Sequence, residues 1–149
     1  MRKIIFTNTD GALCIVHPCR NTIGETLTTD AEIEQRAWDK LPTDAVNPKF
    51  VGASVIPTDR TFRDAWEHSG DSVTQNITKA KAITHDKRRQ ARSAEFAPLD
   101  IKATIPSEAV ASEVARALIR AKYAEMQTAI DTATTITALT TIVAVLEEK

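Results

Sequence analysis

The sequence predicts an α+β protein, with a small N-terminal antiparallel sheet and two helices followed by a mostly helical C-terminal half. Short apolar runs bounded by Gly and Pro dominate the first half and indicate strands. Apolar residues spaced three and four apart dominate the second half and indicate helices. The composition changes at Asn76, so we expect a small α+β domain over residues 1–75 and a helical region over residues 76–149.

The overall composition is that of a folded chain with thin cores. Of the 149 residues, 42% are hydrophobic, 26% are charged and only 5% are aromatic, so we expect much apolar surface to be buried against partners. The net charge of −1 argues against a general nucleic-acid role. No apolar run approaches the ~20 residues that span a bilayer. The start of the chain turns polar too early for a signal peptide, which predicts synthesis in the cytoplasm.

The first element is a hairpin made of strands at 3–7 and 12–17. Asp10 and Gly11 supply its turn, because Gly accepts a positive φ without steric cost. The stretch also resembles the Asp-x-Asp-Gly-Thr signature of aspartate-dependent phosphatases. Asn8 stands where that signature has its nucleophilic Asp, and an amide can neither attack phosphorus nor hold magnesium as a carboxylate does. The residues therefore predict a turn and no phosphatase activity.

A helix over roughly 30–40 follows. Thr29 and Glu32 have the spacing of a capping box at its start, and Pro42 stops it. Apolar residues four apart give the helix one buried face, where Trp38 is expected to anchor the core. We interpret residues 45–48 as a linker.

The rest of the first domain is predicted to contain a strand, a helix and a further short strand. Residues 50–56 have the composition of a strand. A helix is expected over 60–68, with Phe62 and Trp66 at i and i+4 as core anchors. Val73 belongs to a short fourth strand.

The second half begins with a long basic helix over 76–97, and Pro98 and Pro106 bracket the break after it. Its apolar stripe is narrow, and such a helix packs on another chain or bridges two bodies. Its basic face is either solvated or meets acidic groups of a partner. The candidate interface residues on it are Lys87, Arg88, Arg89 and Arg92.

A second helix is predicted to start with Ser107 as its cap. Small and β-branched residues four and three apart form a coiled-coil-type seam that permits close helix approach. The seam residues, which we take as a candidate interface, are Val110, Val114, Ala117, Ala121 and Ala124, with Leu118, Ile119, Tyr123, Met126 and Ile130 broadening the stripe. The last segment, over 134–147, has the spacing of a short helix, although its Thr and Val content also suits a strand.

Few residues carry recognisable chemistry. Cys14, His17 and Cys19 lie within six residues but are too few for a closed zinc site, so we expect no metal. Cys19 follows a proline in a loop, and an exposed thiol there could form an intermolecular disulfide outside the reducing cytoplasm. The acidic residues are scattered, without a carboxylate pair or a Ser/His/Asp set, which predicts neither an enzyme nor a cofactor.

Three segments carry a resemblance to a known group: "VIPTDRTFRDAWE" (55–67), "ITKAKAITHDKRRQARS" (77–93) and "FAPLD" (96–100). In this order, after an N-terminal hairpin, they resemble small proteins of tailed bacteriophages and prophages that tend to be encoded near tail-fibre genes. The resemblance covers roughly 1–130. It implies a non-enzymatic structural protein of the virion tail that binds a tail-fibre or baseplate protein and forms a homo-oligomer or a hetero-complex.

The sequence leaves two alternatives open. The Arg-rich helix running into Pro-Leu-Asp also resembles tail-fibre assembly chaperones, which implies a protein absent from the finished virion. A small nucleic-acid-binding regulatory protein, acting through the basic residues at 79–92, is the other alternative, although the run lacks the interleaved aromatics that stack on bases.

Overall fold

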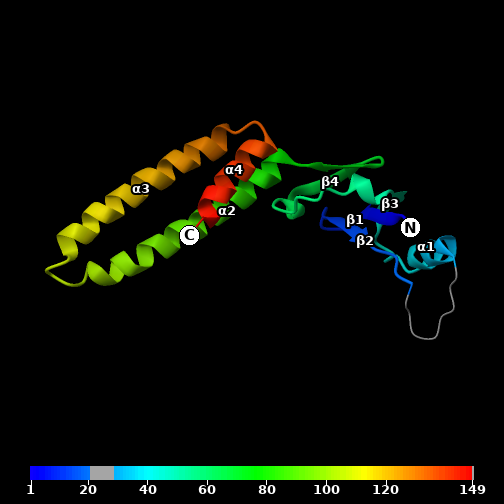
Figure 1. Ribbon diagram of the computed structural model, residues 1–149, viewed down its shortest axis with the longest axis horizontal. Helices are drawn as coiled ribbons and strands as arrows, with labels where there is room; N and C mark the ends of the chain where they lie inside the picture. Colours follow the sequence, from blue (N-terminus) through cyan, green and yellow to red (C-terminus); the bar gives the residue numbers. More distant parts are fainter. Residues whose placement is uncertain (21–28, 149) are drawn as a thin grey trace. The chain divides into compact units, whose positions relative to one another are not determined.

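The computed structural model describes residues 1–20 and 29–148 of the chain (Figure 1). The chain forms two compact units, Met1–Asn76 and Ile77–Lys149. Among the described residues, the first contains two small antiparallel sheets and one α-helix, and the second contains three α-helices. The predicted α+β class, with a sheet near the N-terminus and a mostly helical second half, is confirmed.

The main sheet of the first unit has the strand order β2-β1-β3, with all neighbours antiparallel. It consists of β1 (Lys3–Thr7), β2 (Leu13–Val16) and β3 (Val46–Val51). The three apolar residues in the middle of β1 are buried because β1 is the central strand. Gly11 has a φ of 75°, and the side-chain oxygen of Asn8 accepts a hydrogen bond of 2.8 Å from the Ala12 amide. The predicted hairpin is confirmed, and Asn8 closes its turn.

Helix α1 (Asp30–Asp39) begins with the predicted capping box: the Thr29 hydroxyl accepts a hydrogen bond from the Glu32 amide, and the Glu32 carboxylate accepts one from the Thr29 amide. Its Ile33 side chain is fully buried. Trp38 is half-buried and stacks on Phe50 of β3 with ring centroids 4.8 Å apart. The stacking joins the helix to the sheet at the edge of the core.

The structure corrects two predictions around β3. This strand begins at Val46, so the interpretation of 45–48 as a linker is wrong, and the strand predicted over 50–56 ends at Val51. Pairing with β1 determines these limits, because β3 is an edge strand and an edge tolerates the missing amide hydrogen of Pro48. Asn47 adopts a φ of 52°, a conformation that Asn accepts more readily than most residues, where the register with β1 shifts.

The helix predicted over 60–68 is also wrong. A single 3-10 turn (Arg63–Ala65) leads into a two-stranded sheet of β4 (Trp66–Ser69) and β5 (Ser72–Gln75). Asp59 accepts hydrogen bonds from the amide and hydroxyl of Thr61, which forms a turn in place of a helix start. Phe62 and Trp66 are buried at 1% and 2% exposure, but from a turn and a strand. The predicted short strand at Val73 is confirmed.

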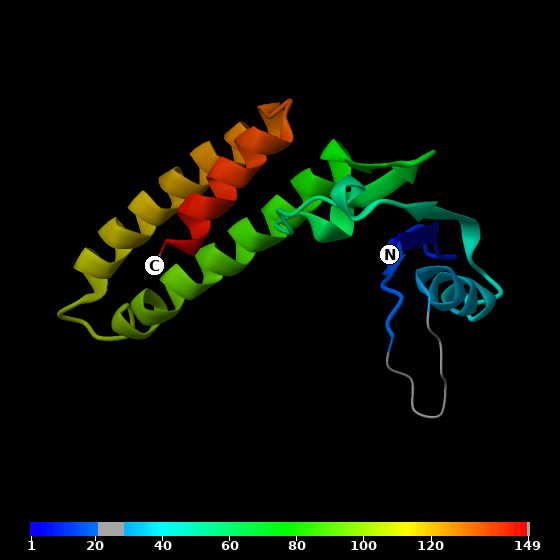
Figure 2. The ribbon, with the colours of Figure 1, turned by 45° about the vertical axis from the view of Figure 1, so that its right-hand side comes forward.

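The second unit consists of α2 (Ile77–Lys102), α3 (Ala109–Thr132) and α4 (Ile136–Glu147). Figure 2 shows α3 and α4 both lying alongside α2. The C-terminal segment, for which the sequence left helix and strand both open, is a helix. Thr135 caps it by accepting a hydrogen bond of 3.2 Å from the Ala138 amide. The buried apolar residues of this unit are Ala80, Tyr123, Ile130, Ala133, Leu139, Val143 and Leu146.

Helix α2 continues five residues past its predicted end, with Pro98 inside it. Proline removes one amide donor from the helix, but the hydrogen-bond pattern resumes, and the Ala103 amide donates to the Leu99 carbonyl at 2.8 Å. The break before α3 spans 103–108. The predicted cap at Ser107 is wrong, because α3 begins after Glu108, whose side chain makes no capping bond.

Candidate functional site

Helix α3 has two different apolar faces. Tyr123 and Ile130 are buried against the other helices of the unit, together with Ser112, and Ile119 and Met126 are half-buried on the same side. The five predicted seam residues are all exposed. Since each helical residue advances by about 100°, the first four lie on the side opposite Tyr123, and Ala124 lies at the edge of that side. The prediction of one broad stripe is therefore wrong, because the sequence contains two stripes on opposite sides of one helix.

The exposed stripe carries large side chains as well as small ones. Val110, Val114 and Leu118 are 79%, 61% and 68% exposed. We call this surface the outer face of α3 and define it as Val110, Val114, Ala117, Leu118, Ala121 and Ala124. Single exposed apolar side chains are ordinary on proteins, but a contiguous row is typical of an interaction surface.

The two flanks of the outer face differ in charge. Glu113 and Arg120 lie one heptad apart on one flank and form an ion pair, and Glu113 also pairs with Arg116 at 3.4 Å. The hydrogen bond from Arg120 holds the pKa of Glu113 below its usual value, and the charge of Arg116 adds to the effect. On the other side of the face, Ala111 and Leu118 are apolar, and Glu125 follows them one heptad later.

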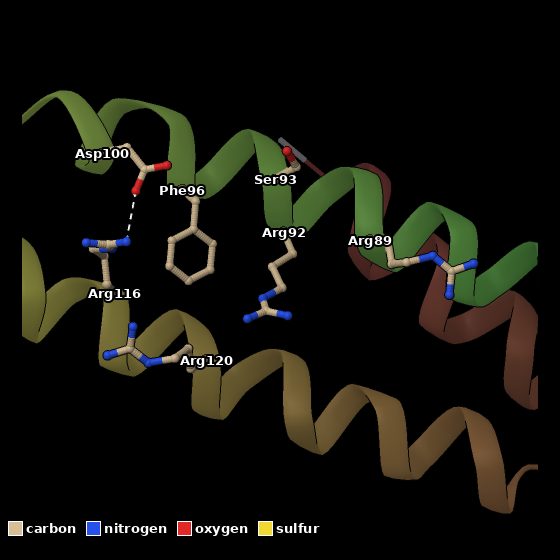
Figure 3. Close-up of a pocket in the computed structure, with 7 residues that line it drawn as sticks. All are labelled: Arg89, Arg92, Ser93, Phe96, Asp100, Arg116 and Arg120. Atoms are coloured by element: carbon tan, nitrogen blue, oxygen red, sulfur yellow. Dashed lines mark ion pairs between the residues drawn. The ribbon is translucent and has the colours of Figure 1, made fainter.

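A second feature is a cleft of about 440 Å³ between α2 and α3, which we call the arginine cleft (Figure 3). The Arg116 guanidinium pairs with Asp100 at 3.1 Å across it. The guanidinium carbons of Arg92 and Arg116 lie 5.3 and 5.7 Å from the centre of the Phe96 ring, within cation–π range. The residues lining the cleft are Arg89, Arg92, Ser93, Phe96, Asp100, Arg116 and Arg120.

The arginine cleft has an excess of positive charge. Arg89 pairs with Asp86, while Arg116 and Arg120 share Glu113, and Asp100 adds one more carboxylate. Within residues 1–20 and 29–148, Arg92 forms no ion pair, and its guanidinium points into the space between the helices (Figure 3). The cleft can therefore accept an anionic group, for which arginine provides charged, forked donors.

The four residues of the predicted basic interface have three different roles in the structure. Lys87 pairs with Glu147 of α4 at 2.6 Å. Arg88 is buried and donates a hydrogen bond of 3.1 Å to the Tyr123 carbonyl, so its prediction as a surface contact is wrong: it joins α2 to α3. Arg89 and Arg92 line the cleft. Sequence reasoning missed Arg116 and Arg120, the two arginines that α3 contributes to the cleft. Their spacing of four was the available signal. Only the packing of α2 against α3 brings them opposite Arg92.

The candidate residues of the first unit that the structure describes differ in exposure. Phe62 and Trp66 lie in its core, and Cys14 is half-buried. Cys19 is exposed, so its intermolecular disulfide stays a prediction. The pKa of His17 is lowered by burial and by nearby positive charges. Over the described ranges 1–20 and 29–148, His, Cys, Asp and Glu form no group of three or more that could hold a metal ion.

The fold and these surfaces define an α+β chain whose helical unit presents an apolar helix face and a basic cleft. Comparison of the chain with protein families, curated proteins and solved structures gave no match. In the part of the chain that the structure describes, no helix has both the length and the hydropathy required to cross a bilayer.

Proposed function

We propose that this protein is a non-enzymatic structural component of a bacteriophage tail that binds a tail-fibre or baseplate protein through its helical unit. The observation that carries the proposal is the outer face of α3, where Val110, Val114 and Leu118 are each more than half exposed in one row. Apolar surface of this kind is stabilised by burial against another protein. The phage context comes from the sequence resemblance described above.

The arginine cleft supports the same proposal by supplying polar contacts. Protein interfaces commonly combine an apolar centre with charged groups nearby. Arg92 and Arg89 are in position to meet acidic side chains of the partner, and such contacts fix orientation more than they add affinity. The cleft contains no histidine, and its one carboxylate, Asp100, is already paired with Arg116, which favours binding over catalysis.

Co-purification with the tail-fibre or baseplate protein of the same phage tests the proposal. Val114→Asp places a charge in the outer face, so we expect it to reduce recovery of the partner at least about tenfold, the effect of burying one unpaired charge. Val145→Asp is the matched control, because Val145 is 49% exposed on α4. Equal recovery with wild type and V114D would show that the partner does not bind this face.

The structural role and the chaperone role differ in where the protein ends up. Mass spectrometry of purified virions is expected to find this chain in a fixed ratio to the tail proteins. Its absence from virions, combined with binding to the fibre protein during assembly, would favour the chaperone instead.

The nucleic-acid alternative is favoured by one observation, the four arginines in the cleft. Three of the four are paired with carboxylates, which reduces their attraction for phosphate. A DNA mobility-shift assay over a range of salt concentrations tests it, since binding through phosphates weakens steeply with salt.

A further inference from the structure

We propose that the outer face of α3 pairs with the same face of a second copy of the chain, with the two helices antiparallel and residues 110–121 facing each other. This inference rests on the proposed function and refines it: a second copy occupies the outer face, so the fibre or baseplate protein binds the paired helical units. Its support comes from the side-chain sizes along the face and from the charges beside it.

The sizes of the side chains are complementary in this antiparallel register. The spacing of four and three places Val110, Val114, Ala117 and Ala121 at the core positions of a coiled coil. In the register proposed, Val114 lies beside Ala117 of the second copy, and Val110 lies beside Ala121. Each layer then combines one larger and one smaller side chain, so the distance between the helix axes stays even. A parallel pair would instead place valine against valine at one end and alanine against alanine at the other.

The charges select the same register. Glu113 faces Arg120 of the second copy, and the two-fold symmetry of the pair makes this contact twice. On the other flank, Leu118 faces Ala111 of the second copy, which keeps apolar groups together. A parallel pair would place Leu118 beside Glu113. An antiparallel pair shifted by one heptad would bring the two copies of Arg120 together, and like charges repel.

The ion pairs within the chain do not oppose this arrangement. The side chains of Glu113 and Arg120 are 56% and 45% exposed, so each carboxylate and guanidinium has free surface for a contact across the interface. Within the described part of the second unit, no other element covers Val110, Val114 or Leu118. The face is therefore open to a second copy without any rearrangement of the helices.

The mass of the full-length protein in solution tests pairing, measured by light scattering across a concentration series. We expect a dimer of the 16.3 kDa chain. Glu113→Arg and Arg120→Glu each turn both symmetry-related contacts repulsive, so each variant alone is expected to dimerise about tenfold more weakly. An equimolar mixture of the two single variants is expected to restore dimers, because each copy then faces opposite charges. An effect confined to the ion pair within one chain would not be rescued by mixing.

Cysteine cross-linking tests the direction of the helices. In a chain with Cys14 and Cys19 replaced by serine, Val114→Cys combined with Ala117→Cys is expected to form disulfide-linked dimers, whereas Ala117→Cys alone is not. Cross-linking by A117C alone would indicate a parallel pair and overturn the proposal, as would a monomer at all concentrations. Circular dichroism of each variant verifies folding. A monomer that still binds the fibre protein would overturn self-pairing and leave the proposed function standing.

Discussion

Tyr123 illustrates at the scale of one residue how the helical unit uses polar groups in its core. Its hydroxyl donates a hydrogen bond of 3.0 Å to Glu95 of α2, and its backbone carbonyl accepts one from Arg88. Burial raises the pKa of Tyr123 to about 12, and the contact with the Glu95 carboxylate adds to the effect. The phenol therefore remains protonated throughout the physiological range and joins α3 to α2.

The titration of Tyr123 can be measured directly, because it is the only tyrosine in the chain. We expect the absorbance of the phenolate to rise with a midpoint near pH 12 in the native protein and near pH 10 in urea. Since the folded pKa exceeds the unfolded one, its contribution to stability is complete below pH 10 and is lost as the pH rises towards 12.

Glu95→Gln is the informative variant for this titration. It removes the carboxylate charge, so the midpoint is expected to fall, while remaining above 10 because burial is the larger cause. A native midpoint of 10 in the wild type would contradict the buried hydrogen bond.

At this scale the sequence predicted the residues of the outer face without their orientation, and it did not predict that Arg116 and Arg120 line the cleft. The spacing of Val110, Val114 and Ala117 predicted a seam, and the structure adds that the seam faces solvent. The sequence did not predict the burial of Arg88, because this residue stands in a run of basic side chains. Which arginine lies inside depends on the contact with Tyr123, and that contact joins residues 35 positions apart.

At the scale of elements, local signals were sufficient where a hydrogen bond within the element determines the structure. The capping box of α1 and the Asp10-Gly11 turn belong to this class, whereas the local signals of α4 left helix and strand both open. The failures occur where pairing with another element decides. The Phe62–Trp66 spacing fits a helix, yet Trp66 is paired opposite Gln75 in β4 and β5, and the extended pairing prevailed.

Pro98 provides a test at the scale of elements, because α2 continues past this proline although the sequence predicts that the helix ends before it. Proline in a helix interior costs up to about 3 kcal/mol relative to alanine, partly offset by the greater freedom of alanine in the unfolded chain. We expect Pro98→Ala to raise the free energy of unfolding of the helical unit by about 1–2 kcal/mol, measured by urea denaturation followed at 222 nm.

Pro106→Ala is the control for this experiment. Pro106 lies in the turn over 103–108, outside any helix. Its replacement is expected to lower stability slightly, by about 0.4–1 kcal/mol, because the unfolded chain gains freedom. A loss of stability in P98A would mean that the proline shapes the end of α2 in a way that the packing requires.

At the scale of the whole molecule, the two units differ in charge as well as in architecture. Residues 1–76 contain eight Lys and Arg against eleven Asp and Glu, whereas residues 77–149 contain eleven against nine. The overall charge of −1 therefore conceals an acidic unit and a basic one. An acidic partner is attracted to the helical unit in particular, which agrees with the arginine cleft as its polar contact.

Each unit also has its own core, so we expect the two to unfold in separate transitions. Both tryptophans, Trp38 and Trp66, lie in the first unit, and the long helices α2 and α3 lie in the second together with α4. Tryptophan fluorescence therefore reports on the first unit alone, and circular dichroism at 222 nm reports mainly on the second.

Two core substitutions separate these transitions. Ile5 and Leu139 are both fully buried, and truncating such a side chain to alanine costs about 2–5 kcal/mol. Ile5→Ala is expected to shift the fluorescence transition to lower urea and leave the dichroism transition in place, and Leu139→Ala is expected to do the reverse. Each variant is the control for the other. If either substitution moves both transitions together, the chain unfolds as one cooperative body, and the helical unit depends on the sheets for its stability.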